Sequence, residues 1–323
     1  MGAVPTVYRW DDDGAPANPA SNNAYDRSAL VGQILKTCLV DGYGAKPAAG
    51  WVAHDVAWPS SSQNGRIIFE NASQSGVAEF VMQGASARVQ AVAAGWDGSS
   101  LVDAVPYQYT LSGDFTYLIG DARSQRWCLI ANDRACVLLV WRDSAGLTGE
   151  GMSLWNGVAF MMGECVPIVP TFSAGAAPNF VGWQCRRLGD PLESPIGDNT
   201  LQSQPVVSRI TAAGVANTYS GDDGFNVQAF RFDNYSNDRI FPAAATVPAA
   251  PFYLAEASPV SVFARWPGLW VSIGIPGNEL LSNDRDVRGQ WTGTSVTVDG
   301  EDRVLVVSNK AYGWVSLASE AWP

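Results

Sequence analysis

Hydrophobic residues recur every three or four positions over residues 26–41, close to the start of the chain. This spacing predicts an amphipathic helix with one buried face. Asp26 or Ser28 can cap its start, and Gly42 follows it, where helices commonly end on a left-handed residue. Before the helix, residues 11–23 are rich in Asp, Pro, Asn and Ala, which predicts an extended arm or loop. The apolar positions of the predicted face are Leu30, Val31, Ile34, Leu35, Cys38 and Leu39.

After residue 44 the pattern changes to short β-branched or aromatic runs separated by Gly, Pro, Asn and Ser clusters. Runs of that length between turn residues are typical of β-strands. The fold class we predict is therefore mainly β, with β-sandwich-like domains and one N-terminal α-helix. The expected strands cover residues 66–70, 76–82, 88–93, 115–119, 126–131, 135–141, 165–169, 179–187, 228–233, 261–266, 294–298, 304–308 and 314–317.

Two pairs of these strands have the spacing of β-hairpins. Residues 126–141 form the clearest one, with Asn132-Asp133-Arg134 as its turn. Residues 294–308 form the other, in which Asp299-Gly300 supplies the positive φ that a tight turn requires.

A long connection is predicted over residues 189–204, where Gly, Asp, Pro and Ser gather, and a second over residues 242–251. The first of them divides the chain into an N-terminal arm, helix and β-rich domain over residues 1–190, and a β-rich C-terminal domain over residues 191–323. One continuous domain is the alternative.

Charge and hydrophobicity exclude several functional classes. Charged residues make up 16% of the chain and hydrophobic residues 47%, so the chain is too apolar to be disordered. The 20 basic and 31 acidic residues give a net charge of −11, which argues against direct nucleic-acid binding. No apolar run reaches the roughly 18 residues that a membrane span needs.

Cysteine and histidine offer little chemistry. The five cysteines are irregularly spaced without a Cys-x-x-Cys pair, and His54 is the single histidine, so we expect no zinc site. Free, mostly buried thiols are expected, although Cys128 and Cys136 can face each other across the first hairpin. A Ser-His-Asp or Cys-His site would have to use His54, but no nucleophile motif accompanies it, and we expect a packing or loop role.

Acidic residues gather in turn-like clusters rather than in catalytic motifs. Residues 11–14, 222–224 and 283–286 combine Asp with Asn or Gly, which favours turns over paired catalytic carboxylates or a calcium loop. No glycine-rich phosphate loop is present. We therefore expect no enzyme activity, no cofactor and no metal, with a glycan hydrolase as the least favoured alternative.

The 13 tryptophans suit three roles, namely sheet packing, contacts between subunits, and stacking on sugar rings. Trp266 and Trp270 flank Pro267-Gly268-Leu269, and we expect this segment to be an exposed, rigid turn. Trp266, Leu269 and Trp270 are the predicted interface residues of that turn.

Several segments resemble an uncharacterised group of tailed-bacteriophage virion proteins. The start, Val7-Tyr8-Arg9-Trp10-Asp11 followed by Gly14-Ala15-Pro16, and the helix end, Leu39-Val40-Asp41-Gly42-Tyr43-Gly44-Ala45-Lys46-Pro47-Ala48-Ala49-Gly50-Trp51, carry the strongest likeness. Arg265-Trp266-Pro267-Gly268-Leu269-Trp270, within residues 261–272, carries a further strong likeness, and residues 127–140 and 160–169 carry weaker ones.

This resemblance implies a structural component of the virion in the tail, neck or baseplate region, assembled in the bacterial cytoplasm. Its expected partners are copies of itself, in a homo-oligomer, and other virion proteins. We expect Tyr8, Arg9 and Trp10 to form an arm that docks on a neighbour. A glycan- or receptor-binding module of a fibre or spike is the alternative.

Overall fold

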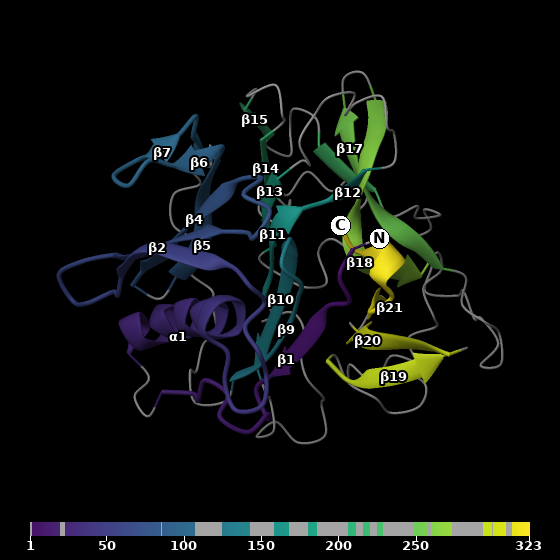
Figure 1. The fold of residues 1–323 in the computed structure, drawn as a ribbon, viewed down its shortest axis with the longest axis horizontal. Helices are drawn as coiled ribbons and strands as arrows, with labels where there is room; N and C mark the ends of the chain where they lie inside the picture. Colours follow the sequence, from purple (N-terminus) through teal and green to yellow (C-terminus); the bar gives the residue numbers. More distant parts are fainter. Residues whose placement is uncertain are drawn as a thin grey trace, which may run out of the picture.

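A seven-stranded antiparallel sheet forms the middle layer of the protein, with the helix and a second sheet on one side and a third sheet on the other (Figure 1). The fold is mainly β with one N-terminal helix, which confirms the predicted class. The computed structural model describes residues 2–19, 23–84, 86–106, 125–142, 158–167, 180–185, 206–210, 216–219, 225–228, 249–257, 260–272, 293–298, 300–307 and 312–323.

Four sheets are formed by the described strands. The central sheet contains, in spatial order, β1 (Thr6–Arg9), β9 (Gln125–Ala131), β10 (Ala135–Arg142), β11 (Val158–Glu164), β13 (Phe180–Cys185), β14 (Val206–Ile210) and β15 (Ala216–Tyr219). The helix sheet contains β2 (Val52–Ala57), β3 (Gly65–Glu70), β4 (Val77–Gln83), β5 (Ser86–Ala93) and β8 (Val105–Pro106). The C-terminal sheet contains β16 (Phe225–Gln228), β17 (Ala249–Ala257), β18 (Val260–Ser272), β21 (Tyr312–Ser316), β20 (Glu301–Val307) and β19 (Ser295–Val298), with β12 (Val166–Pro167) paired to β18. The fourth is a small hairpin of β6 (Gly95–Trp96) and β7 (Leu101–Val102).

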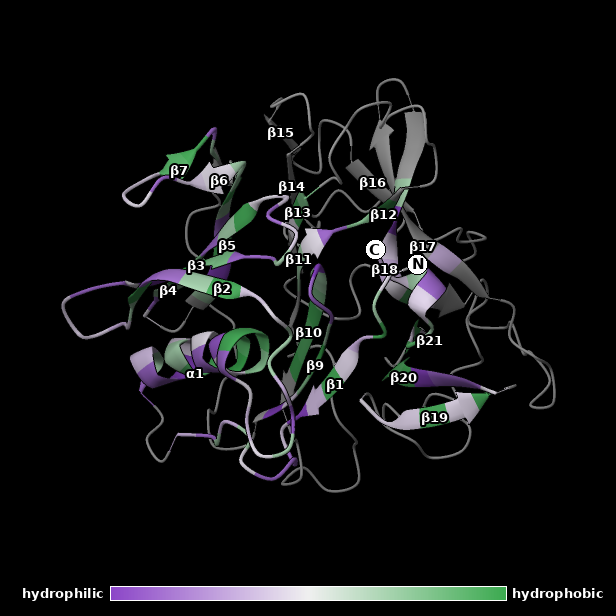
Figure 2. Ribbon diagram, in the orientation of Figure 1, coloured by the Kyte–Doolittle hydropathy of each residue, from purple (hydrophilic) through white to green (hydrophobic). Residues whose placement is uncertain are grey.

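The central sheet is buried on both faces. Because successive side chains of a strand point to opposite faces, Trp127 and Leu129 of β9 enter the core shared with the helix sheet, whereas Cys128 and Ile130 enter the core shared with the C-terminal sheet. Both sets must therefore be apolar, which explains the unbroken hydrophobic runs of β9 and β10. Figure 2 shows these two strands coloured as hydrophobic over most of their length.

The predicted helix exists, with different ends. Helix α1 (Ala24–Lys36) is followed by a π-helical turn, η1 (Thr37–Asp41), and all six predicted apolar positions are buried. Its N-cap is Asn23, whose side-chain oxygen accepts the N–H of Asp26 at 2.8 Å, so the predicted caps were placed too late. Gly42 ends the helix with φ +76°, as predicted.

Most predicted strands in the described ranges coincide with observed ones, and both hairpins are confirmed. Asn132 N–H bonds to the Ala135 carbonyl at 3.0 Å to close the first hairpin, and Gly300 has φ +80° in the second. The predicted strand 115–119, and most of 228–233, lie outside the described residues. The predicted ranges missed β1 and β2, which mix polar with apolar residues, and also β11, β14, β15 and β17.

Strands from both sides of residue 190 share the central sheet. β13 pairs with β14 through Phe180↔Ile210 and Gln184↔Val206, across the segment at which two domains were predicted to meet. The division at residues 190/191 stays a prediction, but it does not separate one sheet from another. Among the described residues, no helix is long and apolar enough to cross a membrane.

Candidate functional site

The outer edge of β1 is covered by the segment that follows the helix. Backbone groups of Val7 and Arg9 form this edge. The Val7 carbonyl accepts a hydrogen bond from Lys46 Nζ at 2.7 Å, and the Arg9 N–H donates to Asp12 Oδ2 at 2.8 Å. The Tyr43 hydroxyl, 3.1 Å from the Arg9 nitrogen, donates to the same carboxylate oxygen at 2.8 Å. Side chains thus satisfy an edge that would otherwise be open to pairing with another chain.

The segment that covers the edge of β1 runs back along the C-terminal end of the helix, and its backbone geometry permits this path. The π-helical turn leaves the Cys38 and Leu39 carbonyls free of helical bonds, and they accept the N–H groups of Ala49 and Trp51, each at 3.0 Å. Gly44 has φ +52°, and a Cβ there would lie 2.3 Å from the Asp13 carbonyl oxygen. Only glycine therefore permits the close approach of the two segments.

The predicted arm residues are part of the chain's own sheet. Tyr8 has 0% exposure and its hydroxyl donates to the Pro47 carbonyl at 2.8 Å, so Tyr8 does not form a free arm. Trp10, just after β1, is 39% exposed, with the Arg126 guanidinium 4.7 Å from its ring centre. A contact of Tyr8, Arg9 and Trp10 with a neighbour stays a prediction, and Trp10 has the most accessible ring for it.

Burial of Tyr8 predicts a loss of stability at high pH. Desolvation raises the pKa of Tyr8 to about 12, whereas the unfolded chain titrates near its ordinary value of about 10. Between these values the folded state holds the proton more tightly, so the free energy of unfolding falls as pH rises, by at most about 1.4 kcal/mol per pH unit. Urea unfolding between pH 8 and about 12 measures this slope. The slope should be shallower in Tyr8→Phe but unchanged in Tyr25→Phe, whose hydroxyl lies at the surface, and equal slopes would contradict the prediction.

The predicted interface turn is a bulge within β18. Pro251 pairs with Trp270 and Tyr253 with Arg265, so residues 266–269 lie opposite the single residue Phe252. Trp266 is 2% exposed and packs in the core between the central and C-terminal sheets, which corrects the expectation of an exposed turn. The local signal was misread because Gly268, with φ +66°, serves a bulge as well as a turn.

Trp270 lies on the opposite face of the C-terminal sheet from that core. Its ring is stacked on Trp314 with centroids 6.3 Å apart and an angle of 8°, and the Arg303 guanidinium lies 4.7 Å from the Trp314 ring. Leu269 is half-buried and packs against the core on the other face. An intersubunit role of Trp266, Leu269 and Trp270 stays a prediction, and Trp266 is committed to the interior.

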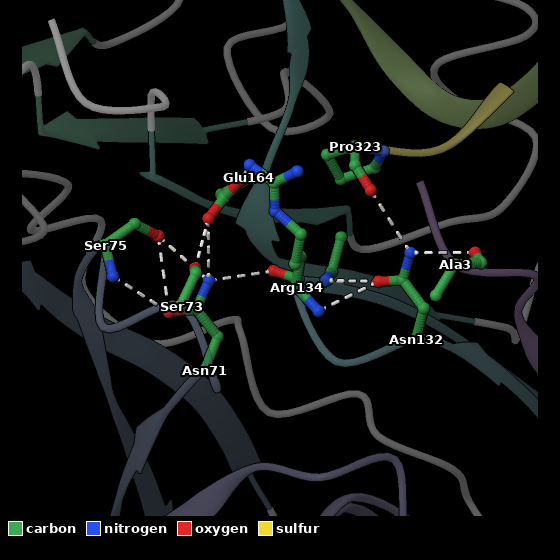
Figure 3. A network of polar contacts seen from close by, with 9 residues as sticks. Ala3, Asn71, Ser73, Ser75, Asn132, Arg134, Glu164 and Pro323 are labelled. Atoms are coloured by element: carbon green, nitrogen blue, oxygen red, sulfur yellow. Dashed lines mark hydrogen bonds and ion pairs between the residues drawn. The ribbon is translucent and has the colours of Figure 1, made fainter. Parts of the chain in front are cut away.

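A buried polar network joins the central sheet to the helix sheet at the β9–β10 turn (Figure 3). Asn132 Oδ1 accepts the N–H groups of Arg134 and Ala135 at 2.9 and 2.8 Å. Its Nδ2 faces the Ala3 oxygen at 3.2 Å and the Pro323 oxygen at 3.5 Å, so the two ends of the chain meet at this turn. We call this set the junction network, with members Asn71, Ser73, Ser75, Asn132, Arg134 and Glu164.

Glu164 is the buried charge of the junction network. Its side chain has 0% exposure and is ion-paired with Arg134, whose side chain is 35% exposed. Ser73 Oγ donates to the same carboxylate, and Asn71 Nδ2 lies 3.3 Å from it. Asn71 Nδ2 also lies 3.0 Å from the Arg134 carbonyl. The loop between β3 and β4 is thereby fastened to the central sheet.

Sequence reasoning missed this network. Glu164 is the last residue of β11 and Asn71 follows β3, but the two residues are 93 positions apart. A lone acidic residue at the end of an apolar run was the only available signal. The turn Asn132-Asp133-Arg134 was predicted, but its contacts were not.

The outer face of the helix sheet carries a second polar group. His54 Nε2 lies 2.8 Å from Glu70 Oε2, its ring stacks on Trp96 with centroids 6.5 Å apart, and Arg66 is ion-paired with Asp55 and Glu79. His54 thus has the packing role that was expected. Within the described ranges, no three His, Cys, Asp or Glu side chains are grouped so as to hold a metal ion.

Four of the five cysteines have described side chains, and all four are buried thiols outside any disulfide, as expected. Cys128 pairs with Leu139 and Cys136 with Ala131, so the two thiols point to opposite faces rather than towards each other. Burial raises the pKa of both thiols to about 12. The four residues are Cys38, Cys128, Cys136 and Cys165.

Comparisons of the chain with protein-family models, with curated proteins and with solved structures found no match.

Proposed function

We propose that this protein is a structural component of a tailed-bacteriophage virion, in the tail, neck or baseplate region. It acts by assembling with copies of itself and with other virion proteins. On this proposal it catalyses no reaction, and it enters the particle in the cytoplasm of the host bacterium.

The observation that carries the proposal is the exposure of large apolar side chains on strands and their flanking turns. Two of them are tryptophans, the residue type most enriched at the energetic centres of protein interfaces. Low charge density reduces the desolvation penalty of burying such a surface. Among the residues whose side chains the structure describes, these exposed side chains, between 39% and 69% accessible, are Val4, Trp10, Val52, Val56, Trp58 and Val102.

Contacts between two segments of the N-terminal part of the resemblance add support. Residues 7–16 and 39–51 lie against each other through Tyr8, Tyr43 and Lys46, so they form one structural unit. The likeness to virion proteins therefore concerns a folded element rather than two unrelated strings.

A glycan- or receptor-binding module is the second candidate. Trp10 is exposed beside Asp11 and Asp13, which are also exposed, and an aromatic ring next to carboxylates is a common means of holding a sugar. In this case Trp10 stacks on a sugar ring instead of a protein neighbour.

Mass spectrometry of purified phage particles that encode this chain tests the proposal. We expect the protein at the copy number of a structural component. Trp10→Ala should lower incorporation by about tenfold or more, since the loss of an interface tryptophan commonly costs about 2 kcal/mol. Its thermal melting should change little because the ring is partly exposed, and Trp10→Phe is the matched control.

Absence of the protein from the particles would contradict the virion role. Normal incorporation of Trp10→Ala, together with lost binding to host-surface glycans, would favour the second candidate.

A further inference from the structure

The N-terminal segment, which we define as residues 2–14, is bound by the rest of the chain much as a ligand would be. Its strand β1 lies at the edge of the central sheet, with β9 as its neighbour among the described strands (Figure 1). Tyr8 is buried, its ring centroid lies 5.9 Å from that of Tyr43, and its hydroxyl donates to the Pro47 carbonyl. The other strands of the central sheet pair without β1. The site that holds this segment therefore belongs to later parts of the chain, and every copy of the protein offers an identical one.

A proline-containing stretch follows this segment. Gly14 ends the segment with φ +77°, and a Cβ built on it would lie 3.3 Å from the Gly44 nitrogen. Residues 15–19, which we call the hinge, lie in no helix or strand and include Pro16 and Pro19. Proline fixes its own φ at about −65° and disfavours helical backbone in the residue before it, so the hinge favours an extended path. Extended, the hinge spans up to about 17 Å, so it can lead the segment away from its own β9 as well as back to it.

Exposed apolar side chains on the segment favour a second copy as its partner. Val4 is 69% exposed and Trp10 39%, whereas Tyr8 between them is buried. When the segment crosses to another copy, it brings Val4 and Trp10 into the contact between the copies. Burial of their apolar area then adds a stabilising contribution that the closed monomer lacks. A second copy also contains the site that Tyr8 fits, as the bond of its hydroxyl to Pro47 shows.

We propose that residues 2–14 are exchanged between neighbouring copies when the protein assembles, with β1 of one copy paired to β9 of the next. This specifies the self-association in the proposed function and rests on it. The β1–β9 ladder, the Tyr8 hydroxyl bond and the bond of Lys46 to the Val7 carbonyl are kept, but they are made between copies. Because both states contain these bonds, the hinge and the local concentration of copies decide between them. Assembly into a particle raises that concentration.

The register of β1 on β9 provides a test of exchange. Arg9 lies opposite the native Cys128 in the ladder. The Trp10 N–H bonds to the Trp127 carbonyl at 3.1 Å, so the next pair along the ladder is a non-hydrogen-bonded one, because the two kinds of pair alternate. Cα atoms in such a pair are about 4.5 Å apart, a separation that allows a disulfide. Arg9→Cys therefore adds one thiol that can link β1 covalently to whichever β9 it pairs with.

The full chain with Arg9→Cys is refolded from urea in a glutathione redox buffer over a series of protein concentrations, because Cys128 is buried in the folded protein. A non-reducing gel separates covalent dimers from monomers, and peptide mapping identifies the link between position 9 and Cys128. We expect the share of dimers with this link to rise about tenfold for each tenfold increase in concentration while monomers predominate. Deletion of residues 16–19 should give linked dimers even at the lowest concentration, because the shortened hinge no longer lets the segment return to its own β9.

Ala131→Cys is the matched control. Ala131 lies opposite the native Cys136 across the β9–β10 hairpin, whose short turn keeps the two strands in one chain. Its link should stay within the monomer at every concentration, and Arg9→Ser reports cross-links made by other thiols. A link of position 9 to Cys128 that is absent or confined to monomers at every concentration, or equal dimer shares in Arg9→Cys and Ala131→Cys, would overturn the exchange. Neither result would bear on the virion role, which is contradicted only by absence from the particles.

Discussion

Arg134→Met is expected to lower the free energy of unfolding by about 3 kcal/mol, because it leaves the carboxylate of Glu164 buried without its counter-charge. Breaking a buried ion pair commonly costs 3–5 kcal/mol, and the lower end applies since the Arg134 side chain is 35% exposed. Ser73 and Asn71 remain as hydrogen-bond partners. Urea unfolding followed by tryptophan fluorescence measures the loss.

Arg66→Met is the matched control for this prediction. Arg66 is 38% exposed, close to the exposure of Arg134, but its partners Asp55 and Glu79 are 41% and 15% exposed, so its loss should cost less than about 1 kcal/mol. Adding Glu164→Gln to Arg134→Met should restore part of the stability, since no buried charge is left unpaired. Equal losses in Arg66→Met and Arg134→Met would contradict the role given to Glu164.

Gly163→Ala is expected to lower the free energy of unfolding by about 3–5 kcal/mol or to prevent folding. Gly163 has φ +118°, and a Cβ there would lie 2.3 Å from the Arg134 carbonyl oxygen and 2.6 Å from the Cα of Ala135. Both are backbone atoms of the β9–β10 hairpin, and they cannot move aside without disturbing the junction network. The yield of folded protein and its thermal melting measure the effect.

Gly98→Ala separates crowding from backbone strain. Gly98 has φ +97°, and no atom lies within 4 Å of a Cβ built there. Gly98→Ala should therefore lower the free energy of unfolding only by the cost of its backbone conformation, about 1–2 kcal/mol. Equal melting temperatures of Gly163→Ala and Gly98→Ala would contradict the energetic cost assigned to the close approach at the hairpin.

Local periodicity was enough to predict the helix and strands β9, β10 and β13 of the central sheet. The apolar positions from Leu30 to Leu39 follow one helical face, and residues 126–141 are apolar because both faces of their strands are buried. In these elements most of the residues of a buried face or of a buried strand are apolar, so the hydrophobic pattern alone indicates the element.

Distant contacts decide the elements that the sequence did not predict. β1 was predicted as an arm rather than a strand, and two side chains that cover its edge, Tyr43 and Lys46, are more than thirty positions away. Trp266 was taken for an exposed side chain because Pro267-Gly268 is a turn signal, which a bulge shares. The ion pair of Glu164 with Arg134 depends on strand pairing, which no local pattern contains.

Burial of the four thiols makes them resistant to oxidation. Only the thiolate reacts readily with oxidants or with disulfides, and burial holds the pKa of Cys128 and Cys136 near 12, far above neutral pH. Cys38 and Cys165 are equally enclosed. At these four positions the same covalent structure therefore persists when the surroundings change from a reducing cell to air-saturated medium, and ageing by oxidation there requires prior unfolding.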